Sequence, residues 1–74
     1  MPRLPRINGQ ECVSALKRLG FVQARQRGSH VIMRCEDRGC SVPMHRELKT
    51  GTLRGILKQA DVGVDEFLAA LRKK

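Results

Sequence analysis

Apolar side chains recur at helical spacing near the start of the chain. Within residues 9–19 the repeating apolar positions are Cys12, Val13, Leu16 and Leu19. Asn8 is a favourable N-cap, and Glu11, three residues further on, completes a capping box. Gly20 follows the last apolar position, as glycine often does at a helix end. We therefore predict a first helix over residues 9–19.

The spacing then changes to the alternation expected of strands. Residues 21–27 and 30–35 favour strands, and Gly28-Ser29 between them favours a tight turn. The second segment alternates between a more apolar set and a more polar set: Val31, Met33 and Cys35 against His30, Ile32 and Arg34. Because side chains of a strand alternate between its two faces, we predict that the apolar set faces the core. His30 and Arg34 then face outward.

A hairpin loop and a short third strand are predicted next. The loop covers residues 36–39 and ends at Gly39, and the strand covers residues 40–43. Pro43 has no N–H to donate to a neighbouring strand, so the third strand ends there or lies at an edge of the sheet. Short connections between the three strands predict an antiparallel sheet.

The second half of the chain returns to helical spacing. Four apolar residues fall at i, i+3, i+4 and i+7, namely Leu53, Ile56, Leu57 and Ala60. We expect Thr50 or Thr52 to cap this helix and Gly63 to end it. We expect Asp65 to cap a last short helix. The side chains that this last helix buries are expected to be Phe67, Leu68 and Leu71.

This order of elements predicts one α+β domain over residues 1–74, arranged α-β-β-β-α with an added C-terminal helix. Helices that cover one face of a three-stranded antiparallel sheet leave its other face open to a ligand. That arrangement is the architecture of a double-stranded-RNA-binding domain.

Charge narrows the class of ligand. The 74 residues include 15 Lys and Arg against 7 Asp and Glu, a net charge of +8. A domain this small and basic commonly binds a polyanion, and nucleic acid is the leading candidate. A basic protein that is merely soluble, or one that binds an acidic protein, is the plainer alternative. No apolar run approaches the roughly 20 residues of a membrane span, and the first residues lack the apolar core of a signal peptide. We expect a cytoplasmic protein with no membrane partner.

Cysteine usage agrees with a reducing compartment. The three cysteines are an odd number, which fits free thiols better than a disulfide framework. Cys35 and Cys40 flank the predicted hairpin loop, with His45 soon after. A zinc site needs a second compact ligand pair, so a reduced cross-strand cysteine pair is the preferred interpretation.

The residues with the clearest chemistry surround Gly28-Ser29-His30. A histidine can accept and donate protons near neutral pH, and Arg25, Arg27 and Arg34 lie close to it in the sequence. RNA cleavage by the 2′-OH needs a base, an acid and cations that stabilise the charge on the phosphorane. His30 could transfer one proton, and His45 or His30 itself the other. An ordinary surface histidine in a turn is the alternative for His30.

The remaining polar residues fit metal-free chemistry. The acidic pairs, Glu36-Asp37 and Asp65-Glu66, are adjacent in sequence and are predicted to lie in a turn and at a helix start. We therefore expect no catalytic metal and no cofactor. Phe21 and Phe67 are predicted to lie in the core, which argues against base stacking and favours backbone contacts with weak sequence preference.

Four stretches of the chain form a specific combination of motifs. The first runs from Leu4-Pro5-Arg6 through Asn8-Gly9 and Glu11 to Leu19-Gly20-Phe21. The others are Arg27-Gly28-Ser29-His30, Val42-Pro43-Met44-His45, and Leu48 to Ala60 followed by Phe67-Leu68. Together they resemble the HicA-type toxins, which are small ribonucleases (mRNA interferases) of type II toxin–antitoxin pairs. The likeness covers nearly the whole chain, and the spacing between Gly-Ser-His and Gly-Thr-Leu-Arg makes it specific.

The resemblance implies a fold, an activity and a partner. It implies an endoribonuclease that cleaves mRNA, with His30 in the position of the catalytic histidine, and the spacing of the carboxylates above predicts that the cleavage is metal-independent. The partner is expected to be a HicB-type antitoxin, acidic because the toxin is basic. The residues expected to bind RNA or its phosphates are Arg27, Gly28, Ser29, Arg34, His45, Lys49 and Arg54.

The chain departs from the family pattern in its second half. Asp61 stands where the family tends to have glycine, and Gly55 lies inside the signature helix, where it costs up to about 1 kcal/mol against alanine. Two other functions stay open. The first is a non-catalytic RNA-binding module on the same fold. The second is a DNA-binding or antitoxin-like protein that uses the helix over residues 53–60, with Arg54 and Lys58 outward, as a recognition helix.

Overall fold

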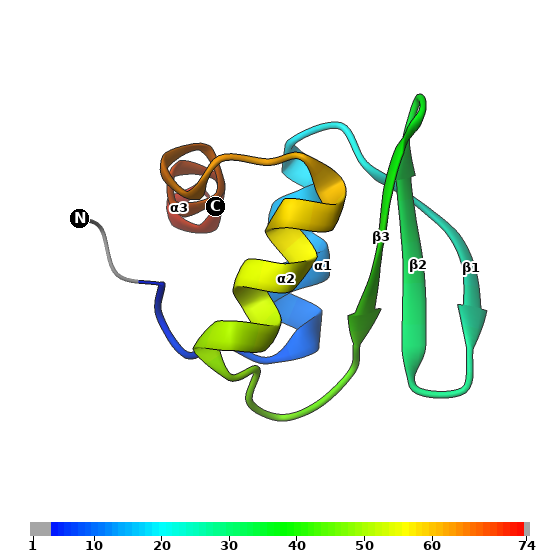
Figure 1. Cartoon of the computed structure of the whole chain (residues 1–74), viewed down its shortest axis with the longest axis horizontal. Helices are drawn as coiled ribbons and strands as arrows, with labels where there is room; N and C mark the ends of the chain where they lie inside the picture. The colour runs from blue at the N-terminus through cyan, green and yellow to red at the C-terminus, as the bar shows by residue number, and fades with distance from the viewer. Residues whose placement is uncertain (1–3, 74) are drawn as a thin grey trace.

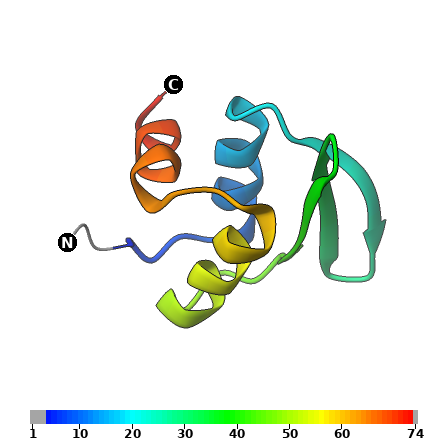
Figure 2. The same ribbon diagram turned by 45° about the horizontal axis from the view of Figure 1, so that its top comes forward.

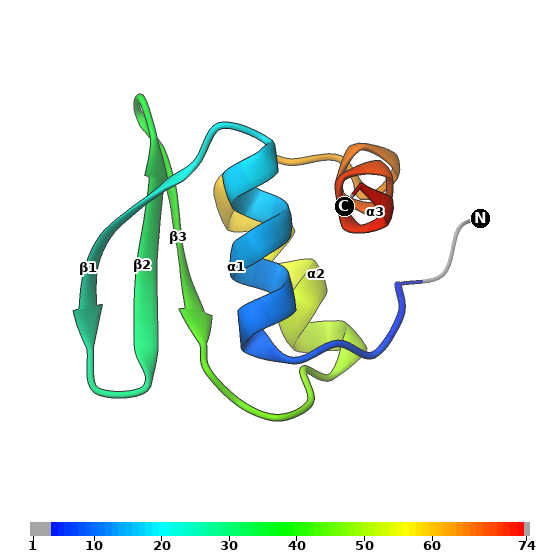
Figure 3. The same ribbon diagram turned by 180° about the vertical axis from the view of Figure 1, so that it is seen from behind.

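A computed structural model describes residues 4–73 and confirms the predicted α+β order of elements (Figure 1). The elements are α1 (Gly9–Arg18), β1 (Val22–Arg27), β2 (His30–Cys35), β3 (Arg38–Pro43), α2 (Thr50–Ala60) and α3 (Val64–Arg72). The strands form one antiparallel sheet in the order β1-β2-β3. All three helices lie on the β3 side of the molecule, and β1 is the strand farthest from them (Figures 1 and 3).

The first helix begins at the predicted capping box. The Glu11 N–H donates to Asn8 Oδ1 at 2.7 Å, and the Asn8 N–H donates to Glu11 Oε1 at 3.1 Å. These two bonds satisfy N–H groups that a helix start leaves without partners. The helix ends at Arg18, one residue before the predicted end, and Gly20 takes a positive φ of 98° just beyond it.

The sheet confirms the predicted faces of β2. Val31 and Met33 are buried, Cys35 is half-buried, and His30 and Arg34 are exposed. Gly28 and Ser29 form the two-residue turn before it, and Gly28 supplies a positive φ of 55° that glycine adopts without a steric penalty. The first strand starts at Val22, one residue later than predicted, because Phe21 packs into the core and is 2% exposed.

The second hairpin corrects the prediction for the third strand. The turn is Glu36-Asp37 alone, and β3 begins at Arg38, two residues before the predicted start at Cys40. Arg38 pairs with Cys35, donates to its Sγ at 3.6 Å, and places its guanidinium 5.2 Å from the centre of the Phe21 ring. These contacts hold Arg38 in the sheet. Glu36 has a positive φ of 59° in this turn, whereas the sequence analysis predicted a longer loop, over residues 36–39, that ends at Gly39.

The same register corrects the cysteine interpretation. Cys40 pairs with Met33, whereas Cys35 pairs with Arg38, so the two cysteines are not directly opposite each other. Cys12, Cys35 and Cys40 are free thiols. Among the described residues, no three His, Cys, Asp or Glu side chains come together as a group that could hold a metal ion. Cys35, Cys40 and His45, all among the described residues, therefore do not come together as a set of metal ligands.

The predicted caps of the last two helices are also wrong. Lys49 is the N-cap of α2, so Thr50 and Thr52 lie inside the helix. The cause is Leu48, which is 1% exposed and whose N–H donates to the Ile7 carbonyl at 2.7 Å, so the chain is held extended up to that residue. The α3 N-cap is Gly63, which leaves Asp65 in the first turn, where a carboxylate still favours the helix dipole.

The ends of these helices complete the core. Helix α2 ends at Ala60, before the predicted stop at Gly63, because Asp61 adopts the left-handed conformation with a φ of 56°. In α3, Phe67 is buried as predicted, whereas Leu68 and Leu71 are only half-buried against the core. Figure 2 shows α3 standing beside α1, away from the sheet.

No helix among residues 4–73 is long and apolar enough to cross a membrane.

Candidate functional site

The face of β2 that points away from the core brings His30 beside an arginine. The strand register pairs His30 with Arg27 and pairs Ile32 with Arg25 on β1. Side chains directly opposite each other on one face of an antiparallel pair have Cβ atoms about 4.5–5.5 Å apart. His30, Arg27 and Arg25 are all exposed. We call this exposed face, formed by Arg25, Arg27, His30, Ile32 and Arg34, the outer face.

The turn beside His30 leaves the histidine accessible. Gly28 has no neighbouring atom within 4 Å of the position that a Cβ would occupy, and Ser29 is small and exposed. The Gln26 side-chain amide donates to the Gly28 carbonyl at 3.1 Å and stabilises the turn. A phosphate can therefore approach His30 and Arg27 from the end of the hairpin.

The second histidine is brought to the same end of the sheet. The Met44 N–H donates to the Ser29 carbonyl at 2.6 Å, which extends the β2–β3 pairing one residue beyond Pro43. The carbonyl of the next residue, His45, accepts a 2.9 Å hydrogen bond from the N–H of Gly9. The backbone of His45 is thus fixed between the turn that precedes His30 and the start of α1.

A close backbone approach makes this attachment possible. Gly9 is buried, and a Cβ at this position would lie 2.5 Å from the Pro43 carbonyl oxygen and 2.7 Å from Met44 Cα. Only glycine lets the N-terminus of α1 sit against the segment that carries His45.

The other predicted cations do not all join this group. His45, Lys49 and Thr52 line a pocket of about 310 Å³ at the start of α2. Arg54 lines a different pocket with Leu4, Arg6 and Thr50. Arg34 shares the outer face with His30 but lies four residues along the strand, which is about 13 Å at the usual rise. Arg34 therefore does not belong to the group around His30.

Two features of the outer face were missed from the sequence. Arg25 was noted as a nearby cation but not as a site residue, although alternation from Arg27 gives it the same face. Val22 was missed because the register shifts between Gln23 and Arg25, which leaves Ala24 as a bulge. The bulge turns Val22 onto the face of its partner Arg34.

The ionisable groups whose pKa values are shifted lie away from this face. Burial raises the pKa of the Cys12 thiol to about 12 and that of the Cys40 thiol to about 11. The pKa of Arg38 is raised by its hydrogen bond to the Cys35 sulfur. These side chains hold protons tightly near neutral pH, so they are structural rather than acid–base groups.

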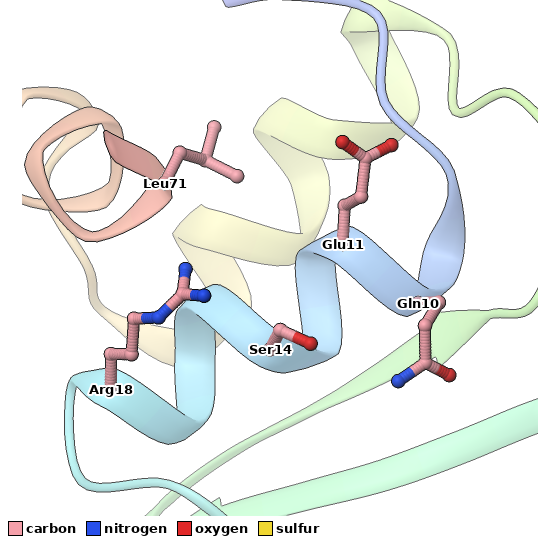
Figure 4. Close-up of a pocket in the computed structure, with 5 residues that line it drawn as sticks. All are labelled: Gln10, Glu11, Ser14, Arg18 and Leu71. Atoms are coloured by element: carbon pink, nitrogen blue, oxygen red, sulfur yellow. The ribbon is translucent and has the colours of Figure 1, made fainter. Parts of the chain in front are cut away.

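A further pocket belongs to the helices. Gln10, Glu11, Ser14, Arg18 and Leu71 line a space of about 190 Å³ between α1 and α3 (Figure 4). Arg18 reaches across and donates to the Ala70 carbonyl at 2.9 Å, which fastens α3 to α1. This pocket contains neither histidine, and we assign it a structural role.

The fold and the outer face define a small basic α+β domain with a histidine and arginines exposed on its sheet. A family model of the HicA toxins of bacterial toxin–antitoxin systems matches residues 9–62. The match covers well over half of the chain, from the start of α1 to the end of α2, and includes every predicted site residue. The chain therefore belongs to the HicA toxin family. Comparison with curated proteins and with solved structures gave no match.

Proposed function

We propose that this HicA toxin is a metal-independent endoribonuclease that cleaves mRNA, with His30 as a general acid and base. The observation that carries the proposal is the placement of His30, exposed on the central strand and directly opposite Arg27. A proton-transfer group beside a cation is what cleavage by the RNA's own 2′-OH requires.

The residues have separate roles in this mechanism. His30 accepts the proton of the 2′-OH as that oxygen attacks the adjacent phosphorus. Arg27 stabilises the added negative charge on the phosphorane, and Arg25 binds the neighbouring backbone. The 5′-oxygen leaves with a proton from His45 or from protonated His30. The products are a 2′,3′-cyclic phosphate and a free 5′-hydroxyl, so every atom comes from the RNA.

Substrate binding depends on charge more than on base contacts. Phe21 and Phe67 are both buried at 2% exposure or less, so neither ring can stack on a base. Arginine contacts to phosphates, from Arg25, Arg27 and Arg34, carry little sequence information. We therefore propose that the protein has a weak sequence preference. We also propose that it acts on mRNA in the cytoplasm and that an acidic HicB-type antitoxin inhibits it.

The alternative is a non-catalytic RNA-binding module. The observation in its favour is that both histidines are exposed, as ordinary surface histidines are. The two functions differ in what they predict for His30. A binding module tolerates His30→Ala with a small loss of affinity, whereas a ribonuclease keeps affinity and loses cleavage.

The test is cleavage of a fluorescent single-stranded RNA in EDTA by the wild type, His30→Ala and His45→Ala. Losing one general acid or base typically lowers the rate about 10²–10⁴-fold, which is the expected effect of His30→Ala. His45→Ala is expected to lower the rate less. Affinity for an uncleavable 2′-deoxy analogue and circular dichroism show whether binding and fold survive. Wild-type rates for His30→Ala would contradict the catalytic role.

A further inference from the structure

The first strand is an edge of the sheet, and nothing else in residues 4–73 pairs with its outer side or covers it. All six residues of β1 are exposed, and it lies at the far side of the sheet from the helices (Figures 1 and 3). Val22 is 63% exposed and is the one exposed large hydrophobic side chain among residues 4–73. An uncovered edge strand can pair with an added strand from another chain.

The hydrogen bonds show which backbone groups face this free edge. The Met44 N–H donates to the Ser29 carbonyl, so His30 and Pro43 are a pair without mutual hydrogen bonds. The backbone groups of His30 therefore point toward β1, where they meet Arg27. Hydrogen-bonding direction alternates from residue to residue along a strand. The N–H and carbonyl of Gln26, which precedes Arg27, therefore point away from β2 to the free edge.

Charge decides what can pair there. The sequence of β1, Val-Gln-Ala-Arg-Gln-Arg, contains two arginines and no acidic residue. A second copy of this chain at the edge would bring four arginines together, and like charges on neighbouring strands are destabilising. An extended segment with acidic residues beside Arg25 and Arg27 and an apolar residue beside Val22 complements the edge.

We propose that the antitoxin docks on this edge by adding an acidic strand to β1. This proposal depends on the proposed function in one respect, which is that the partner is the antitoxin of a toxin–antitoxin pair. The added strand would lie beside Arg27, which is opposite His30, so strand addition also places the antitoxin two strand spacings, about 10 Å, from the strand that carries the candidate catalytic group.

The test uses the purified complex of this protein with the antitoxin that is encoded at the same locus. Amide exchange by NMR is expected to show the Gln26 N–H slowed at least ~100-fold in the complex, because a new backbone bond protects it. The Asp37 N–H, in the turn at the opposite end of the sheet, serves as the control and is expected to keep its free rate.

A pair of variants tests the same bond by affinity. Gln26→Pro removes the outward N–H but no β1–β2 bond, and proline is tolerated at such an edge position. It is expected to weaken antitoxin binding about 10-fold, while Gln26→Thr keeps the N–H and binds as the wild type does.

Four results would overturn strand addition. One is fast Gln26 exchange in the complex, and another is equal affinity for the proline and threonine variants. The third is protection of Gln26 by uncleavable RNA without antitoxin, and the fourth is no antitoxin binding by the wild type. Each measurement reports binding alone, so a wild type that fails to cut RNA would contradict the ribonuclease without changing this outcome.

Discussion

Replacing Asp61 with glycine is expected to stabilise the protein. Asp61 ends α2 in the left-handed conformation, with a φ of 56°, and its side chain is exposed. Its N–H donates to the Lys58 carbonyl, and its own carbonyl accepts from Arg38 Nη1 at 3.3 Å. Both bonds use backbone atoms of residue 61, so glycine can keep them.

The magnitude follows from three effects. The left-handed conformation costs a residue with a Cβ roughly 1–2 kcal/mol, toward the lower end for aspartate. A carboxylate at a helix C-terminus opposes the dipole by about 0.3 kcal/mol at an exposed site. Glycine loses about 0.5 kcal/mol through the greater freedom of the unfolded chain. The net gain is about 1 kcal/mol, or a rise in Tm of roughly 4–8 °C for a domain of this size.

Urea unfolding and a thermal melt measure the change, with two control variants. Asp61→Asn removes the charge alone and is expected to gain about 0.3 kcal/mol. Asp61→Ala removes the charge but keeps the Cβ, so it should remain about 1 kcal/mol less stable than Asp61→Gly. Equal stability of the alanine and glycine variants would refute the conformational argument.

The remaining predictions concern two glycines and the buried thiols. Gly9→Ala is expected to lower the free energy of unfolding by about 1–3 kcal/mol, because its Cβ would overlap backbone atoms of Pro43 and Met44. Gly55→Ala, with open space around it, should raise the free energy of unfolding by up to about 1 kcal/mol. Equal effects of the two variants in urea titrations would contradict the packing argument. Stability is also expected to fall between about pH 9 and 11, because the unfolded chain loses thiol protons that buried Cys12 and Cys40 retain, by up to about 1.4 kcal/mol per pH unit for each thiol. The Cys12→Ala/Cys40→Ala variant should show a shallower decline, and an unchanged slope would count against it.

Local patterns predicted much of the fold. The capping box at Asn8 and Glu11 specified the start of α1 because both halves of the motif lie within four residues. Alternation in residues 30–35 gave β2 its bounds and its faces, and hence the exposure of His30 and Arg34. These features depend on neighbours in sequence, which is why they could be read without the structure.

Other features depend on contacts between distant residues. Lys49 is the α2 N-cap because Leu48 is held against Ile7, forty-one positions earlier, and no local capping preference indicates that. Glu36 and Asp61 adopt positive φ values that sequence rules assign to glycine. Asp61 occupies the position where the family resemblance suggested glycine, and its backbone conformation explains that preference.

The candidate site was predicted in part. Alternation correctly predicted that His30 is exposed, and the predicted two-residue turn is what makes Arg27 its cross-strand partner in the structure. The sequence analysis also proposed Arg34 and Arg54 as phosphate-binding cations beside His30, but the rise of β2 and the separate pocket around Arg54 distribute these cations over the surface. The link from Gly9 to His45 needed the tertiary structure.

The most direct measurement of the central claim is the chemistry of the RNA ends that the wild-type protein produces in EDTA. Mass spectrometry of the fragments is expected to show 2′,3′-cyclic phosphate or its 3′-phosphate hydrolysis product, with 5′-hydroxyl on the other fragment. The same reaction with His30→Ala, at equal protein concentration, should yield these ends at least ~100-fold more slowly. Fragments with 3′-hydroxyl and 5′-phosphate ends, or cleavage that EDTA abolishes and magnesium restores, would contradict metal-free acid–base catalysis by His30.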